Sequence, residues 1–386
     1  MHRNVTQLPA ILAWVLLATT PLRAADLRNT LDLLVPEPPT PVDVGGQTRL
    51  VYELHLTNFS EDEVLLERIE VLDARRGAVL ASFADADLVA VLGHPGMRVS
   101  PPDPRLIGPG MRAVSYFWLT LPRGAPVPAL IAHRLTLDLP KSTDTAALTT
   151  QGGTVVPRAG PPLVLGPPLR GGPWVAVYDP SMARGHRRVE FSVEGRAVVP
   201  ARFAIDWFKV GDDGKLARDD KTVTANWYGY GADVLAVAKA VVRSVRDHMP
   251  ESPLVSMTGP RKPLQDASGN FIVLDLNFGH YAFYEHLRPG SIRVHAGDHV
   301  VPGQVIASLG YTGDSSGPHL HFHVAEGASP LAAEGLPYVI RDFKVLGDYG
   351  STAAFAAGHP WTAAQKHPDR RAREFPLANS VIRFAP

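Results

Sequence analysis

Residues 319–324 read His-Leu-His-Phe-His-Val, so that histidine alternates with an apolar residue. Side chains of a β-strand point alternately to the two faces of a sheet, and a period of two therefore predicts a strand with His319, His321 and His323 on one face. Neighbouring imidazoles repel one another when they are charged, and ligation of a metal by neutral imidazole removes that conflict. A solvated, histidine-rich edge is the alternative interpretation of the same pattern.

Further strand-like runs occur along the whole chain, separated by turn residues. Helical periodicity is weak throughout, and the 36 prolines and 34 glycines punctuate short elements. We therefore predict an all-β fold, with a β-sandwich-like domain in the first half and a second strand-rich domain after it. The candidate strands are residues 50–57, 64–72, 113–119, 131–137, 203–207, 234–238, 241–245, 271–276, 281–284 and 305–309.

Composition shifts divide the 386 residues into segments. Dense proline and glycine in residues 157–173 predict a linker. The β-sandwich-like accessory domain would cover residues 25–156, and the second domain residues 174–347. Residues 348–386 are expected to be a polar, alanine-rich C-terminal tail without a clear core pattern. The accessory domain would be a binding or spacer module, or would have a purely structural role.

The first residues are typical of a signal peptide. Arg3 supplies a positive charge, residues 8–22 are mostly apolar, and Ala24-Ala25 offers a cleavage region. We predict a signal peptide in residues 1–24 and export to the periplasm or the exterior. An uncleaved anchor is the alternative, although the stretch is short against the ~20 residues of a membrane span. No later stretch suggests a span, so the mature protein should have no stable membrane segment.

Charge and cysteine content exclude some classes of partner and site. Lys plus Arg and Asp plus Glu both number 38, so the formal net charge is zero and nucleic acid is not an expected partner. The chain has no cysteine. The fold therefore contains no disulfide, and any metal site has to be built from histidine and carboxylate side chains.

Three motifs in the second half occur together. Residues 310–322 read GYTGDSSGPHLHF, residues 284–287 read YEHL and residues 297–304 read GDHVVPGQ. They match the patterns G-x-T-G-x-S-x-G-P-H-L-H-F, Y-x-H-L and G-x-x-V-x-x-G-Q, and they closely resemble the lysostaphin-type (LytM-like) zinc endopeptidases, which cut peptide cross-links of bacterial cell walls. The resemblance covers roughly residues 174–347 and implies an antiparallel β-sheet metallopeptidase domain.

The resemblance implies roles for individual residues of these motifs. The second histidine of H-x-H binds zinc in the family, which points to His321, and the first is the usual general base, which points to His319. The histidine of Y-x-H-L lies beside the reaction centre, where His286 would position water or stabilise the oxyanion. A histidine packed on an aromatic strand is the alternative for His286. His323 stands where the family usually has Glu, and would support the ligands or face solvent.

The remaining ligands depart from the family pattern H-x-x-x-D. Asp206 follows an apolar run and matches the Asp, but Arg202 occupies the usual His position. Arginine is permanently cationic and cannot ligate zinc. His186, 20 positions before Asp206 (206 − 186), is the best replacement, as in family members that use a loop histidine. Weaker alternatives for this ligand are His248, His280 and His299.

The resemblance thus implies one Zn²⁺ held by His186, Asp206 and His321, with one tetrahedral position open for water whose pKa falls to about 7. His319 would accept the proton of that water. The expected function is a secreted zinc metalloendopeptidase that hydrolyses peptide bonds of peptidoglycan cross-links. A hydrolase of another extracellular peptide is one alternative. Another is a catalytically inactive scaffold or regulator of cell-wall hydrolysis, against which the retained H-x-H and His286 argue.

Overall fold

The computed structural model describes residues 31–97, 101–141, 148–180, 182, 185–256, 262–364 and 369–386. Strands make up most of the ordered elements in these ranges, so the prediction of an all-β fold is confirmed. The predicted signal peptide, residues 1–24, lies outside the described residues. None of the helices found in the described ranges has the length and apolar character needed to cross a membrane.

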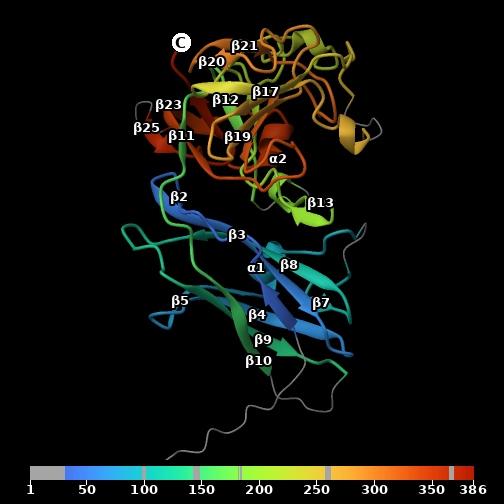
Figure 1. The fold of residues 1–386 in the computed structure, drawn as a ribbon, viewed down its shortest axis with the longest axis vertical. Coiled ribbons are helices and arrows are strands. Elements are labelled where there is room, and N and C mark those ends of the chain that lie inside the picture. Colours follow the sequence, from blue (N-terminus) through green and yellow to red (C-terminus); the bar gives the residue numbers. More distant parts are fainter. Residues whose placement is uncertain are drawn as a thin grey trace, which may run out of the picture.

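The first half of the chain is a sandwich of two five-stranded sheets (Figure 1). Their inner faces share one apolar core that includes Leu54, Phe117 and Leu135, and one short helix, α1 (Asp85–Val91), packs on it through Leu88. One sheet has the order β1 (Leu31–Leu34), β3 (Gln47–Asn58), β8 (Arg112–Thr120) and β6 (Leu92–Gly93), with β2 (Val42–Val44) on β3. The other has the order β10 (Leu148–Val155), β9 (Ile131–Asp138), β4 (Val64–Asp73) and β5 (Ala78–Ala84), with β7 (Leu106–Ile107) on β4.

The second half is built on one large sheet of 12 strands (Figure 1). Its pairs are antiparallel except for the parallel pair of β11 with β23. The order along the sheet is β11 (Leu163–Leu165), β23 (Tyr338–Asp348), β26 (Ser380–Arg383), β12 (Trp174–Val177), β15 (Ile205–Lys209), β22 (Leu320–Ala325), β19 (Tyr281–Glu285), β18 (Phe271–Asp275), β17 (Ala240–Arg246) and β20 (His299–Val300), and β24 (Thr362–Ala363) and β25 (Asp369–Glu374) pair with β23.

Smaller elements surround this sheet. Two short antiparallel pairs are β13 (Phe191–Val193) with β14 (Arg196–Val198), and β16 (Asp233–Leu235) with β21 (Val305–Ser308). Among the residues of this half that the structure describes, the helical segments are α2 (Thr352–Ala356) and three 3₁₀ turns, at His186–Arg188, Thr224–Asn226 and Leu264–Asp266.

Two segments that the sequence assigns to a linker and a tail contain strands of the large sheet. β11 lies within residues 157–173, and β25 and β26 lie within residues 348–386. Ile382 and Phe384 are buried in the main core, which contradicts the expectation that this region has no core pattern. The four-residue strand β26 lies between β12 and β23 in the sheet. These neighbours are distant in sequence, so the local sequence of β26 does not reveal its burial. The predicted domain boundaries as a whole stay a prediction.

The two halves share an apolar core. Val42, Val44 and Val51 of the first half belong to the same buried cluster as Phe203 and Phe375 of the second. The amide of Phe375 also donates a 2.8 Å hydrogen bond to the carbonyl of Asp43. The sandwich is therefore packed directly on the domain that holds the large sheet.

Replacing Ile382 by alanine should lower the free energy of unfolding by about 2–5 kcal/mol, because the change leaves a cavity in a fully packed core. Ile382 is completely buried and pairs across the sheet with Trp174. Urea unfolding followed by tryptophan fluorescence measures the effect. Arg383→Ala, on the exposed neighbour in the same strand, is the control. Equal stability of the two variants would contradict an integral role for β26.

Stability of the sandwich should fall in acid because of His133. Its Nδ1–H donates to the carbonyl of Gly153 at 3.1 Å, its Nε2 accepts from the hydroxyl of Tyr52 at 2.9 Å, and burial lowers its pKa to about 4. The unfolded chain, with a histidine pKa of about 6.5, binds more protons between these values. The stabilisation present above pH 6.5 is therefore lost towards pH 4, by roughly 3 kcal/mol.

Thermal unfolding between pH 7 and pH 4 measures this loss. His133→Gln, which keeps a polar group beside Tyr52, should show a shallower dependence on pH than the parent chain. His55, whose pKa burial also lowers to about 4, and the buried His286 and His323 contribute to the dependence that remains. Parallel pH curves for the two proteins would show that His133 does not carry the effect.

Candidate metal centre

Two of the three proposed ligands, Asp206 and His321, lie on neighbouring strands of the large sheet, and the third, His186, begins the 3₁₀ turn His186–Arg188. Asp206 in β15 is directly opposite His321 in β22, and His321 is directly opposite Glu285 in β19. The alternate residues of these strands, among them Trp207 and Phe322, are fully buried in the main core. The period of two predicted for residues 319–324 therefore separates an apolar core face from a polar face that carries the imidazoles.

His186, Asp206 and His321 converge on one point of this face. Nε2 of His186 lies 3.0 Å from Oδ2 of Asp206, and Nδ1 of His321 lies 2.8 Å from Oδ1. One ligand atom from each of the three residues lies within 4.8 Å of the other two. Tetrahedral zinc with bonds of about 2.1 Å needs ligand atoms about 3.4 Å apart, and two imidazoles with one carboxylate form a usual donor set. These residues therefore fit a zinc ion.

The carboxyl group of Asp206 is ionised in this setting. Burial by itself raises its pKa, but the charges of His186 and His319 and their hydrogen bonds hold the pKa well below its usual range. Burial lowers the pKa of His186, whereas the Asp206 carboxylate more than offsets this and leaves that pKa raised. The negative charge of Asp206 thus attracts a cation, whether a proton on an imidazole or a metal ion.

The ring of His319 is held on two sides. It is almost fully buried and stacks on Phe208 with ring centroids 4.6 Å apart. Its Nδ1–H donates to the carbonyl of Gly317 at 2.8 Å, which leaves the lone pair of the neutral ring on Nε2. Nε2 lies 3.3 Å from Oδ1 of Asp206. Two acceptor atoms at this separation require a cation or a proton beside them, which is a second observation that fits a metal at this point.

His286 follows directly after β19 and completes the group of imidazoles. Its backbone has a φ of 62°, a left-handed conformation that costs of the order of 1–3 kcal/mol and that the surrounding structure has to support. Its Nδ1–H donates to the carbonyl of Thr312 at 2.8 Å, and its ring centroid lies 4.8 Å from that of His319. Burial and the charges of His319 and His321 hold the pKa of His286 well below its ordinary value.

The neutral His286 ring with its proton on Nδ1 can accept a hydrogen bond through Nε2 but cannot donate one there. This state is suited to orienting a water molecule. Stabilising an oxyanion would require a proton on Nε2 as well, which the lowered pKa opposes. The hydrogen bond at Nδ1 and the lowered pKa therefore favour the positioning of water by His286 over the stabilisation of an oxyanion.

The glycine-rich turn supplies the carbonyl groups that hold these two rings. The hydroxyl of Thr312 donates to the carbonyl of Leu287 and accepts from the amide of Asn270, each at 2.9 Å. Gly317 lies against the indole ring of Trp227, with which any Cβ at this position would collide. Only glycine permits this close approach, so the motif has a structural reason at that position.

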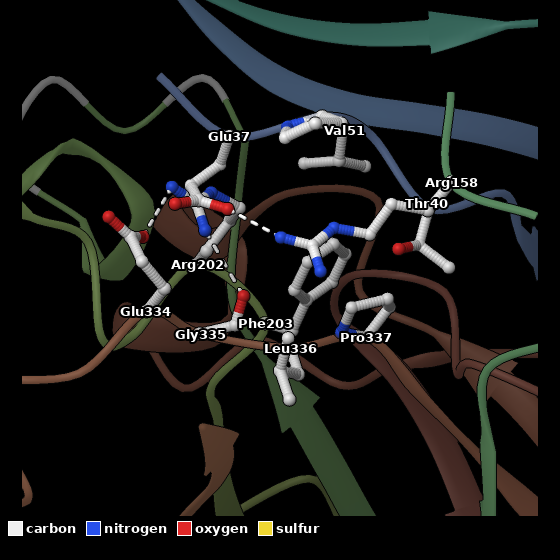
Figure 2. A pocket seen from close by; sticks show the side chains of 11 residues that line it. Glu37, Thr40, Val51, Arg158, Arg202, Phe203, Glu334, Gly335, Leu336 and Pro337 are labelled. Atoms are coloured by element: carbon white, nitrogen blue, oxygen red, sulfur yellow. Dashed lines mark hydrogen bonds and ion pairs between the residues drawn. The ribbon is translucent and has the colours of Figure 1, made fainter. Parts of the chain in front are cut away.

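Arg202, in the position of the usual histidine ligand, does not face the metal-binding group. It is buried, and its guanidinium binds Glu53 and Glu334, each at 2.8 Å, and the carbonyl of Gly335 at 3.1 Å. Figure 2 shows the Arg202 side chain beside Glu334 and Gly335 in a pocket lined by residues of both halves of the chain. Arg202, which cannot ligate zinc, instead compensates the charges of two buried carboxylates.

His323 and Glu285 form a neighbouring buried pair. His323 is only 2% exposed, so the interpretation of His323 as a solvent-facing residue is wrong. Its ring stacks on Phe283 with centroids 4.4 Å apart, and its Nδ1 lies 3.9 Å from Oε1 of Glu285. Burial raises the pKa of Glu285 and lowers that of His323. No sequence pattern indicates Glu285, because only the cross-strand register places it opposite His321.

Other histidines considered for the missing ligand lie elsewhere. Among the described residues, no group of side chains able to hold a metal includes any of the three alternatives, His248, His280 and His299. Two groups of such side chains besides the one around Asp206 contain His321, one with His286 and His319 and one with Glu285 and His323. All of these groups share the same polar face.

One region of the chain matches a known protein family. Residues 227–333 match peptidase family M23, and no curated protein matches the chain. Among solved structures, the chain is similar to the catalytic domain of the antimicrobial peptidase lysostaphin from Staphylococcus simulans, with 22% identity over 43% of this chain and 88% of that chain and a TM-score of 0.23.

Two further solved structures are also similar. A mutant catalytic domain of the prophage-encoded M23 protein EnpA from Enterococcus faecalis shows 18% identity over 47% of this chain and 92% of that chain, with a TM-score of 0.23. A zinc-containing peptidase from Vibrio cholerae shows 17% identity over 76% and 81%, with a TM-score of 0.22. The range that matches the family, residues 227–333, includes His286, His319 and His321. Residues 227–333 thus form a region that matches the model of peptidase family M23.

Proposed function

We propose that this protein is an exported zinc-dependent endopeptidase that hydrolyses peptide bonds in bacterial cell-wall cross-links. The observation that carries the proposal is the convergence of His186, His321 and His319 on the Asp206 carboxylate, with N–O distances of 2.8–3.3 Å. The match of residues 227–333 to a peptidase family supports hydrolysis of a peptide bond. The close match of the glycine-rich motif to lysostaphin-type enzymes supports the cell-wall substrate.

His186, Asp206 and His321 would hold the ion. When bound, zinc supplies a Lewis acid that polarises a carbonyl group and lowers the pKa of water. The ionised state of Asp206 suits this task, because ligands have to be deprotonated. Both histidine ligands lie close enough to the carboxylate to be oriented by it before any ion arrives.

His319 is suited to the transfer of the proton. The hydrogen bond from Nδ1–H to the Gly317 carbonyl fixes the tautomer, so Nε2 can accept the proton of the attacking water. The same carbonyl stabilises the imidazolium that forms, and Nε2–H can then donate this proton to the leaving amine. Proton transfer by a positioned side chain of this kind contributes typically 10²–10⁴-fold to the rate. His286 would accept a hydrogen bond from the water and orient it.

Export rests on the leader-like residues 1–24, with their charge, apolar run and small residues at the end. A cell-wall substrate lies outside the cytoplasm, so the two parts of the proposal are consistent with each other. The absence of cysteine agrees with both, because the fold then needs no oxidative step after export.

Ligand and base variants should separate zinc binding from catalysis. His186→Ala, Asp206→Ala and His321→Ala should lose both bound zinc and activity. His319→Gln should keep about one zinc per chain and lose 10²–10⁴-fold in kcat, since only the proton acceptor is removed. Elemental analysis of the purified proteins measures zinc, and release of soluble peptides from purified peptidoglycan measures activity.

His299→Ala, on an exposed histidine outside the group, is the matched control and should retain both properties. A folded parent chain that binds no zinc and cleaves neither peptidoglycan nor an unrelated polypeptide would refute the proposal in favour of an inactive scaffold. Cleavage of the unrelated polypeptide alone would refute the cell-wall substrate and retain the zinc peptidase.

A further inference from the structure

The turn that carries His186 is anchored on the N-terminal sandwich. Arg187 donates from Nη2 to the carbonyl of Phe117 at 2.8 Å, and Arg188 donates to the carbonyl of Ala90. Glu190 accepts a hydrogen bond from the hydroxyl of Tyr116 at 3.1 Å. Three of the four residues that follow His186 are thus tied to a different domain from the one that holds Asp206 and His321.

Strand β8 of the sandwich provides the surface on which this turn lies. The guanidinium of Arg187 lies 5.6 Å from the centre of the Trp118 ring, and that of Arg188 lies 5.2 Å from the Tyr116 ring. Contacts between arginine and aromatic faces are attractive and are stronger where water is excluded. Figure 1 shows the following segment, with β13, between the sandwich and the large sheet. The position of the turn therefore depends on how the two domains are packed.

Glu53, in the sandwich strand β3, contacts the segment that carries His186 and the segment that carries Asp206. Its side chain is 1% exposed. Oε1 lies 3.8 Å from Nη2 of Arg187, next to His186, and Oε2 lies 2.8 Å from Nη2 of Arg202, four residues before Asp206. Removing one partner of such a buried group leaves the other charges uncompensated. A single carboxylate of the sandwich thus binds two arginines, one next to His186 and one in the segment that leads to Asp206.

We propose that the N-terminal domain is the positioning element of the metal centre, and that Glu53 and Arg187 are positioning residues that hold His186 at Asp206. This inference rests on the proposed zinc site. In the family pattern H-x-x-x-D, both ligands come from one short segment. Here Arg202 takes the histidine position and binds Glu53, while the ligand arrives from a turn docked on the sandwich. Zinc affinity in this chain then depends on the contact between the domains.

The physical basis is preorganisation of the ligand. A histidine on an unanchored turn has to be ordered when the metal binds, and that entropy reduces the affinity. Groups that orient a metal ligand typically contribute 10–100-fold to metal affinity. Arg187 keeps its charge for this task at neutral pH, although burial lowers its pKa to about 10.

The test measures the zinc dissociation constant of the full-length chain by competition with a chromophoric chelator. Glu53→Gln and Arg187→Ala should weaken zinc binding 10–100-fold, towards the value for His186→Ala. Arg196→Ala is the matched control, because it breaks another ion pair between the domains, with Glu37 at 2.9 Å, in which the arginine side chain is exposed rather than buried. This control should bind zinc like the parent chain.

A double-mutant cycle distinguishes positioning from general loss of structure. If Glu53 acts through His186, Glu53→Gln should have no further effect on zinc affinity in the His186→Ala background. Tyr116→Phe, which deletes only the hydroxyl that donates to Glu190, is a milder variant for the case that Glu53→Gln does not fold, and should weaken zinc binding two- to tenfold. Circular dichroism of each variant verifies the fold.

Parent-like zinc affinity in Glu53→Gln and Arg187→Ala, or in Tyr116→Phe where those two do not fold, would overturn the inference and leave the zinc site intact. An equal loss from Glu53→Gln with and without His186 would overturn it as well, because Glu53 would then act on the fold as a whole. A parent chain that is folded and binds no zinc would overturn the proposed function together with this inference.

Discussion

The carboxylate of Asp206 is the charge on which the candidate metal centre depends. Oδ1 contacts His321 and His319, and Oδ2 contacts His186, so three imidazoles are arranged around one ionised group. A carboxylate that is mostly removed from water needs a cationic partner. The strand pairing of β15 with β22 brings Asp206 opposite His321, and the apolar residues on the reverse of both strands fix this pairing by burial in the main core.

The two domains are packed through charged residues as well as apolar ones. With Arg202 in the usual ligand position, a second histidine has to reach Asp206 from another segment. Arg202 itself is neutralised by Glu53 and Glu334 in the buried interface, and the His186 turn lies against β8. A single substitution in the ligand pattern thus accompanies an arrangement in which the accessory domain borders the proposed site.

Local sequence patterns predicted the parts of the site that lie within one strand or one turn. The alternation in residues 319–324 gives the common face of His319, His321 and His323, and the glycine-rich motif gives the turn before them. Glu285 could not be found in this way, because its place opposite His321 is a matter of register between two strands. The burial of β26 was missed for a related reason, since its neighbours in the sheet are distant in sequence.

The sequence by itself determined the all-β class, the resemblance to a peptidase family and the exclusion of Arg202 as a ligand, because each of these follows from residue type and short-range spacing. Only the tertiary structure decided that His186 lies at Asp206 and that Glu53 contacts Arg202 across 149 positions of the chain. Such contacts depend on strand register and on the packing of two domains. The free energy of that packing comes from many buried side chains, and no local pattern contains it.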